Sequence, residues 1–138
     1  MYKYEHTLRI KAHPSTVFDT FFDYKNYYKW QPSLKAVHLK QGEYRKANHQ
    51  IDLVYQNDTV LNESVELYDR PHTAVFTYCF QSVFNRQMMY FKKEDEDTLL
   101  TVVTEFYFPN KPNTPKSVFE EQTLKNLKRI KSYIETIK

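Results

Sequence analysis

Cysteine, glycine and long apolar runs are all scarce in this chain. Cys79 is the single cysteine, so no disulfide can form within the chain, which favours a reducing compartment such as the cytoplasm. No apolar run approaches the roughly 20 residues that a membrane-spanning helix needs. The opening segment MYKYEHTLRI also has no apolar signal core. We therefore expect a cytoplasmic protein without a transmembrane segment.

Gly42 is the only glycine in the chain. Asn and Asp must therefore take the left-handed turn positions that glycine usually occupies. The glycine patterns that bind phosphates or dinucleotides are absent, and no Ser-His-Asp order of a hydrolase is present. The five histidines are scattered without ligand spacing, which argues against a metal site. We expect neither a metal nor a cofactor.

Charges of the two signs are too evenly mixed to predict a nucleic-acid surface. The chain has 20 basic and 17 acidic side chains and a formal net charge of +3. Locally, Lys25, Lys29 and Lys35 are interleaved with tyrosines and Trp30, a pattern that can stack bases and hold phosphates. The alternative is that these lysines solvate a half-buried aromatic helix. Without a recognised binding motif, we expect no nucleic-acid partner.

Length and composition predict one globular domain that covers residues 1–138. Apolar residues make up 41% of the chain and charged residues 27%, and no low-complexity tract interrupts them. A chain of this size supports one hydrophobic core, and its composition argues against disorder.

The spacing of apolar residues predicts an α+β fold. Alternation over 2–10 indicates a half-buried strand, Pro14 suits the first position of a short helix, and a second short helix over 24–30 ends before Pro32. Further strands are expected at 34–40, 46–56, 59–68, 72–81, 86–94 and 98–108. Their connections are too short for parallel crossovers, so we predict an antiparallel sheet of about seven strands.

A long helix is predicted at the C-terminal end of the chain. It begins either with Thr114 as the N-cap and Pro115 in the first turn or at the capping box of Ser117 and Glu120. Its apolar stripe consists of Phe119, Leu127, Ile130, Ile134 and Ile137. About 23 residues at roughly 1.5 Å each give a rod of about 35 Å, which matches a ten-residue strand at roughly 3.3 Å per residue. A curved sheet around such a rod can leave an apolar cavity between them.

This order of elements, together with the segment RIKAHPSTVFDTFFDYKNYYKWQPSL, resembles the START/polyketide cyclase superfamily, whose helix-grip fold also occurs in the birch pollen allergen. The matching positions are Ala12, Pro14, Val17, Phe18, Asp23, Trp30 and Pro32. The resemblance implies a curved antiparallel sheet wrapped around the C-terminal helix. It also implies binding of a lipid, sterol, quinone, polyketide or plant hormone, with some members acting as cyclases or as adaptors for other proteins.

The alternating faces of the strands indicate which residues line the expected cavity. Leu67 and Phe80 belong to the predicted inward faces. The candidate ligand-binding residues are Tyr28 and Trp30 at the rim, His49, Ile51, Leu53, Glu63, Val65, Phe76, Tyr78, Met89, Phe91, Val102 and Thr104 on the strands, and Leu127 and Ile130 on the helix.

Polar residues on these inward faces are candidates for chemistry. A buried carboxylate without a partner costs several kcal/mol, so Glu63 lies near an open strand end, is paired, or meets a ligand. His49 either donates to a ligand, acts as a general base, or is hydrogen-bonded structure. With Tyr78, these two residues form the candidate catalytic set.

Three functions remain open at this point. The preferred one is binding or transport of a small hydrophobic molecule. The second is a cyclase or dehydratase that needs no metal or nucleotide cofactor. The third is an interaction module whose Lys and Tyr side chains on the second short helix dock a protein or, transiently, a membrane surface.

Overall fold

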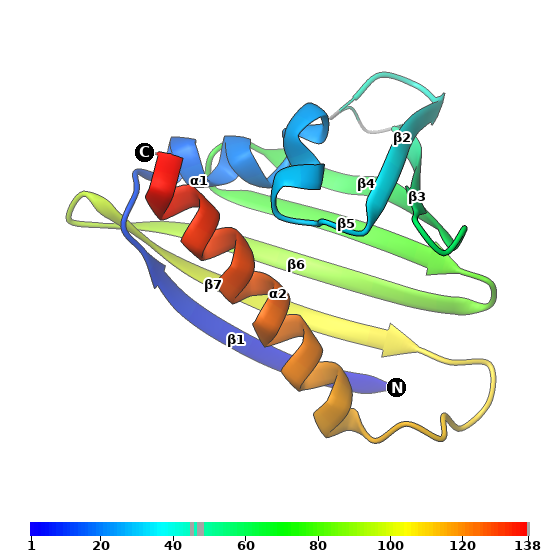
Figure 1. The fold of residues 1–138 in the computed structure, drawn as a ribbon. Coiled ribbons are helices and arrows are strands. Elements are labelled where there is room, and N and C mark those ends of the chain that lie inside the picture. The colour runs from blue at the N-terminus through cyan, green and yellow to red at the C-terminus, as the bar shows by residue number, and fades with distance from the viewer. Residues whose placement is uncertain (45, 47–48, 138) are drawn as a thin grey trace.

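A computed structural model describes residues 1–44, 46 and 49–137 of the chain (Figure 1). The elements are β1 (Tyr2–Ile10), α1 (Pro14–Phe21), the 3-10 helix η1 (Tyr24–Lys29), β2 (Leu34–Gln41), β3 (Gln50–Tyr55), β4 (Val60–Asp69), β5 (Thr73–Phe80), β6 (Val83–Glu94), β7 (Asp97–Tyr107) and α2 (Lys116–Ile137). No helix in this described part of the chain is long and apolar enough to cross a membrane.

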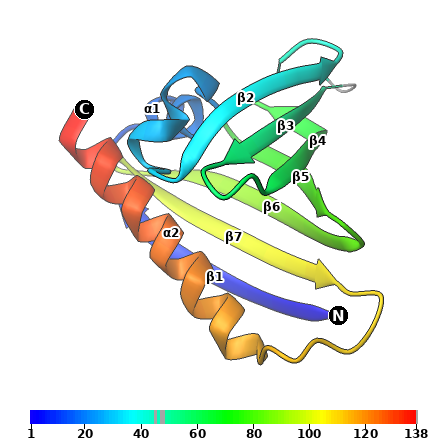
Figure 2. The same ribbon diagram turned by 45° about the vertical axis from the view of Figure 1, so that its right-hand side comes forward.

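The strands form one sheet of seven, in the order β1-β7-β6-β5-β4-β3-β2. Every neighbouring pair is antiparallel. Figures 1 and 2 show that the sheet is curved, so that it forms a trough. The α2 helix lies along β1 and β7, and β2 and β3 lie on the opposite side. The α1 and η1 helices close the end of the trough that is near the C-terminal end of α2. The predicted helix-grip architecture is confirmed.

The α1 and α2 helices both begin at or next to a proline. Pro14 occupies the first turn of α1, and Nδ1 of His13 accepts a hydrogen bond from the backbone N–H of Ser15 over 3.2 Å. The α2 helix begins directly after Pro115, close to the first of the two predicted starts. Its buried residues are Leu127, Ile130 and Ile134, whereas Ile137 is 50% exposed. The apolar stripe of α2 therefore ends before Ile137.

Two strand boundaries differ from the prediction by more than one residue. The strand expected at 46–56 begins at Gln50, and positions 47 and 48 of that range lie outside the described residues. The strand expected from 86 begins at Val83, because a turn of only two residues lets Phe80 pair with Val83. Gln81 adopts a left-handed φ of 54° in that turn. Left-handed conformations at Asp58 and Asp95 confirm the expectation that aspartate replaces glycine in turns.

A β-bulge reverses the face of Leu67. The pairing of β4 with β5 shifts between Val65 and Leu67, which inserts one extra residue into β4. Leu67 is consequently 46% exposed, and Tyr68 packs against the main core in its place. The prediction that Leu67 points inward was wrong for this reason. Phe80 was also expected inward but is 38% exposed at the end of β5.

Within the described part of the chain, buried apolar side chains form two clusters. The larger cluster joins α1, the centre of the sheet and α2, and includes Phe18 and Phe76. The smaller cluster contains Tyr24 and Tyr27 of η1 together with Leu34, Ile51 and Leu53 of the adjoining strands. Trp30 and Tyr78 pack against both clusters. These two side chains therefore stand where the two parts of the core adjoin.

Candidate functional site

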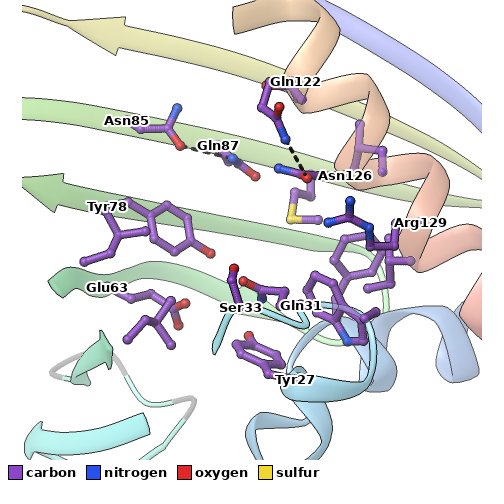
Figure 3. Close-up of a pocket in the computed structure, with 18 of the residues that line it drawn as sticks. Tyr27, Gln31, Ser33, Glu63, Tyr78, Asn85, Gln87, Gln122, Asn126 and Arg129 are labelled. Atoms are coloured by element: carbon purple, nitrogen blue, oxygen red, sulfur yellow. Dashed lines mark hydrogen bonds between the residues drawn. The ribbon is translucent and has the colours of Figure 1, made fainter. Parts of the chain in front are cut away.

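A cavity of about 400 Å³ lies between the sheet and α2 (Figure 3). This volume is within the range of small-molecule pockets. The lining residues are Phe21, Phe22, Tyr27, Trp30, Gln31, Ser33, Leu53, Tyr55, Leu61, Glu63, Tyr78, Asn85, Gln87, Met89, Phe106, Phe119, Gln122, Thr123, Asn126, Leu127, Arg129 and Ile130. They come from α1, η1 and its following loop, from five strands, and from α2.

The cavity has an aromatic part and a polar part. Rings are contributed by Phe21, Phe22, Tyr27, Trp30, Tyr55, Tyr78, Phe106 and Phe119. On α2, Nε2 of Gln122 donates a hydrogen bond to Oδ1 of Asn126 over 3.1 Å. Across the cavity on β6, Nε2 of Gln87 donates to Oδ1 of Asn85 over 3.0 Å. Polar groups were expected on the inward strand faces, and Glu63, Gln87, Tyr55 and Tyr78 do line the cavity. The carboxamides of α2 add a polar wall that was not expected.

The polar residues of α2 also mark the entrance. Gln122, Asn126 and Arg129 are solvent-exposed, as is Ser33 in the loop between η1 and β2. A residue that is exposed and also lines the cavity stands where the cavity meets solvent. The mouth therefore lies between this face of α2 and the loop that carries Gln31 and Ser33 (Figure 3).

Glu63 belongs to a buried polar cluster at the deep wall. Its side chain and that of His49 are fully buried, and Nε2 of His49 lies 3.3 Å from Oε1 of Glu63. The hydroxyl of Tyr24 donates a hydrogen bond to the same Oε1 over 2.9 Å and lies 3.4 Å from Nε2 of His49. The other oxygen, Oε2 of Glu63, has no hydrogen-bond partner among the residues that the structure describes.

Three tyrosines near Glu63 are held in their neutral form. Burial raises the pKa of Tyr27 and of Tyr78 well above the ordinary value, and the negative charge of Glu63 raises both further. Burial, followed by the charge of Glu63, raises the pKa of Tyr55 to about 12. These hydroxyls remain hydrogen-bond donors at neutral pH. Tyr78 pairs with Glu63 across β5 and β4, and both side chains point into the cavity (Figure 3).

Arg129 is the cationic residue of the lining. The guanidinium projects from α2 over the cavity (Figure 3). Within the described part of the chain it has no ion-pair or hydrogen-bond partner. The cavity thus has a carboxylate oxygen without a partner at its deep wall and a guanidinium without a partner at its mouth.

The structure brings about half of the predicted ligand-binding residues to the cavity surface. Those that line it are Trp30, Leu53, Glu63, Tyr78, Met89, Leu127 and Ile130. Those buried outside the lining are His49, Ile51, Val65, Phe76, Phe91, Val102 and Thr104. Of these, His49 still contacts a lining residue, because it faces Glu63.

Tyr28 is placed differently from the prediction. Its side chain is 57% exposed and lies in a separate hollow on the outside of η1 and β2, beside Lys25 and Lys35. It is therefore not at the rim of the cavity. Docking of a protein or a membrane surface through this face stays a prediction.

Sequence reasoning missed the polar residues of the mouth. Asn85 was assigned to a turn because β6 was expected to begin later. Gln122, Asn126 and Arg129 follow one another at i, i+4 and i+7 on α2, which places them on one helix face. This face adjoins the buried stripe of Leu127 and Ile130. That position next to the stripe was the one feature of the sequence that indicated polar residues at the edge of the cavity.

The cluster is equipped for acid–base chemistry as well as for binding. A buried carboxylate can accept a proton from a bound molecule, and the neutral hydroxyl of Tyr78 can donate a hydrogen bond to a developing oxyanion. No metal is needed for either step. Binding alone uses the same groups as fixed hydrogen-bonding partners.

A family of polyketide cyclases, dehydrases and lipid-transport proteins matches residues 1–135. The chain belongs to this family. The resemblance to the START/polyketide cyclase superfamily is thereby confirmed, and the family is one of ligand-binding proteins. A search of curated proteins finds no match.

Solved structures similar to this chain carry the same fold. Ara h 8.0201 shares 12% identity with a TM-score of 0.83, covering 98% of each chain. A START superfamily protein from Mycobacterium smegmatis shares 18% identity with a TM-score of 0.79, covering 100% of each chain. The aromatase/cyclase Zhui from a Streptomyces species shares 14% identity with a TM-score of 0.72, covering 97% of this chain and 91% of its own. Likeness at these identities establishes the fold alone.

Proposed function

We propose that this protein binds one small, partly apolar molecule in the cavity between the sheet and α2 and acts as its carrier. The observation that carries the proposal is a cavity of about 400 Å³ with aromatic walls and an entrance beside exposed residues of α2. Apolar surface that a ligand buries there contributes about 25 cal/mol per Å². The hydroxyl and carboxamide groups of the wall orient the molecule.

Native mass spectrometry tests this proposal without knowledge of the ligand. Protein purified from its own host under non-denaturing conditions is expected to carry an additional mass that is lost on denaturation. Asn126→Phe, which places a ring in the mouth, should remove that mass. Lys125→Phe provides the matched control, because Lys125 is exposed on the same helix and does not line the cavity. No bound mass, together with no thermal shift across a panel of lipophiles, would contradict the proposal.

A second function is favoured by the cluster around Glu63. Glu63 lines the cavity, its Oε2 has no hydrogen-bond partner among the described residues, and Tyr78 beside it is held neutral. In a dehydratase, Glu63 would take the proton from the carbon next to a substrate carbonyl and return it to the departing hydroxyl, which leaves as water while a C=C bond forms. In a cyclase, the same carbon would instead form a C–C bond to a second carbonyl carbon of the substrate, whose oxygen would take the proton. His49 and Tyr24 would position the carboxylate through their contacts with Oε1.

Incubation of the molecule released from native protein with fresh protein separates the two functions. If the protein is an enzyme, the molecule should lose the mass of one water, or gain a ring at unchanged mass with a new chromatographic retention time. Glu63→Gln should then abolish turnover while binding persists. A molecule that is recovered unchanged by mass and retention time excludes dehydration and cyclisation and supports the carrier.

A further inference from the structure

We propose that the ligand is an amphiphile with two polar ends: a hydroxyl that donates a hydrogen bond to Glu63 and an anionic oxygen group that pairs with Arg129. This inference rests on the proposed binding function and specifies its ligand class. It follows from two charged groups that have no partners among the described residues and that line one cavity whose wall also carries apolar side chains.

The deep end of the cavity requires a donor. Tyr24 and His49 both contact Oε1 of Glu63, whereas Oε2 has no partner among the described residues. An unsatisfied oxygen of a fully buried carboxylate is unfavourable, and a donor from the ligand removes that penalty. His49 already faces the carboxylate, so a neutral hydroxyl meets the requirement without a full positive charge.

The mouth of the cavity requires an acceptor. Arg129 extends its guanidinium over the cavity and has no partner within the described residues. A guanidinium presents a planar fork of N–H donors that matches the geometry of a carboxylate. The indole N–H of Trp30, another residue of the wall, also has no partner in the described part of the chain. The guanidinium of Arg129 therefore selects an anionic oxygen group.

The same cavity also has an apolar wall. Phe21, Met89, Leu127 and Ile130 line it and present no hydrogen-bonding side chain. The body of the ligand is therefore apolar, and its polar groups are restricted to its ends. This pattern differs from that of a simple hydrocarbon chain and from that of a uniformly polar metabolite.

Calorimetric titration of the wild-type chain with four matched probes tests the inference. The probes are ω-hydroxydodecanoate, ω-methoxydodecanoate, dodecanoate and dodecanol. The hydroxyl donates to Oε2, whereas the methoxy ether can only accept, so the hydroxy acid should bind about tenfold or more tightly than the methoxy acid. Dodecanoate should bind more tightly than dodecanol by about two- to fivefold, because the Arg129 pair is exposed.

Variants assign each preference to its residue. Glu63→Gln places an amide N–H₂ where an acceptor was. The ratio of the affinities for the hydroxy acid and the methoxy acid should therefore fall to about one. Glu66→Gln on the same strand is the matched control, because Glu66 is exposed and pairs with Arg86. Arg129→Gln should remove the preference for dodecanoate over dodecanol, and Lys125→Gln on the same helix should retain it.

The outcomes separate this inference from the proposed function. Equal binding of the hydroxy and methoxy acids by the wild-type chain overturns the role of Glu63, and this comparison requires no substitution. A carboxylate preference that survives Arg129→Gln overturns the role of Arg129. In either case, saturable binding of dodecanoate still supports a ligand-binding cavity, whereas failure of all four probes to bind contradicts both proposals.

Discussion

The hydroxyl of Tyr24 on η1 donates a hydrogen bond over 2.9 Å to Oε1 of Glu63 on β4, within a fully buried part of the molecule. The bond joins residues 39 positions apart in the chain. It fixes one oxygen of the carboxylate, whereas the other has no hydrogen-bond partner among the described residues. The side chain of Glu63 points into the cavity (Figure 3). A single contact thus connects the packing of η1 with the chemistry of the deep wall.

Removal of this hydroxyl should destabilise the protein measurably. We expect Tyr24→Phe to lower the free energy of unfolding by about 1.5 to 3 kcal/mol, because a buried charged acceptor loses its donor. Urea unfolding followed by circular dichroism measures the change. Tyr90→Phe on the exposed outer face of β6 should change it by less than about 0.5 kcal/mol. Equal effects of the two substitutions would contradict the importance of the bond.

Phe22 is predicted to be a major contributor to the stability of the core. It is 2% exposed, and its ring stacks on Phe76 with centroids 4.6 Å apart and planes at 14°. Phe22→Ala should cost about 3 to 5 kcal/mol, because it removes this contact and leaves a space beside the existing cavity. Phe84→Ala, at a position 48% exposed, should cost less than about 1 kcal/mol in the same thermal or urea experiment. A loss at Phe22 as small as that at Phe84 would show that the ring is not packed as described.

Alkaline pH should weaken the fold through the buried tyrosines. The pKa of Tyr55 is raised from an ordinary 10.0 to about 12, chiefly by burial and then by the charge of Glu63. Its contribution to stability is fully present below pH 10 and is lost as the pH rises through about 12. The loss from Tyr55 reaches at most about 2.7 kcal/mol and is smaller where solvent screens the site.

Measurement of the free energy of unfolding between pH 8 and pH 11 checks this dependence. The wild-type curve should fall above about pH 10, and Tyr55→Phe should make the fall less steep. Tyr28→Phe, at a side chain 57% exposed, should leave the slope unchanged. A curve that is flat up to pH 11 would contradict the burial of these hydroxyls.

The order of elements could be predicted from the sequence because strands and helices impose different spacings on apolar residues. Glu63 was found because a carboxylate on an otherwise apolar strand face is rare and costly. Its partner Tyr24 was not found, because their contact depends on how η1 packs against the sheet. The inverted face of Leu67 was missed for a related reason: a bulge interrupts a period of two without leaving a glycine to mark it.

The polar mouth was missed because helix periodicity does not distinguish two kinds of polar face. Asn126 and Arg129 have the spacing of an ordinary solvated stripe, and only the position of α2 on the sheet shows that this stripe borders a cavity. The same spacing is expected for a helix face that contacts only solvent and for one that contacts a bound ligand. Tyr28 illustrates the converse, since its place in an aromatic segment suggested the rim, whereas η1 turns it outward.

The central claim, that a small molecule enters the cavity, is tested most directly by fluorescence of Trp30, the single tryptophan of the chain and a residue of the cavity wall. Bromine quenches tryptophan on contact, so titration with ω-bromododecanoate should quench Trp30 saturably with one molecule per chain. Dodecanoate should compete with this quenching, Asn126→Phe should abolish it, and Lys125→Phe should retain it. Saturable binding without quenching, or equal quenching in both variants, would contradict a ligand site between the sheet and α2.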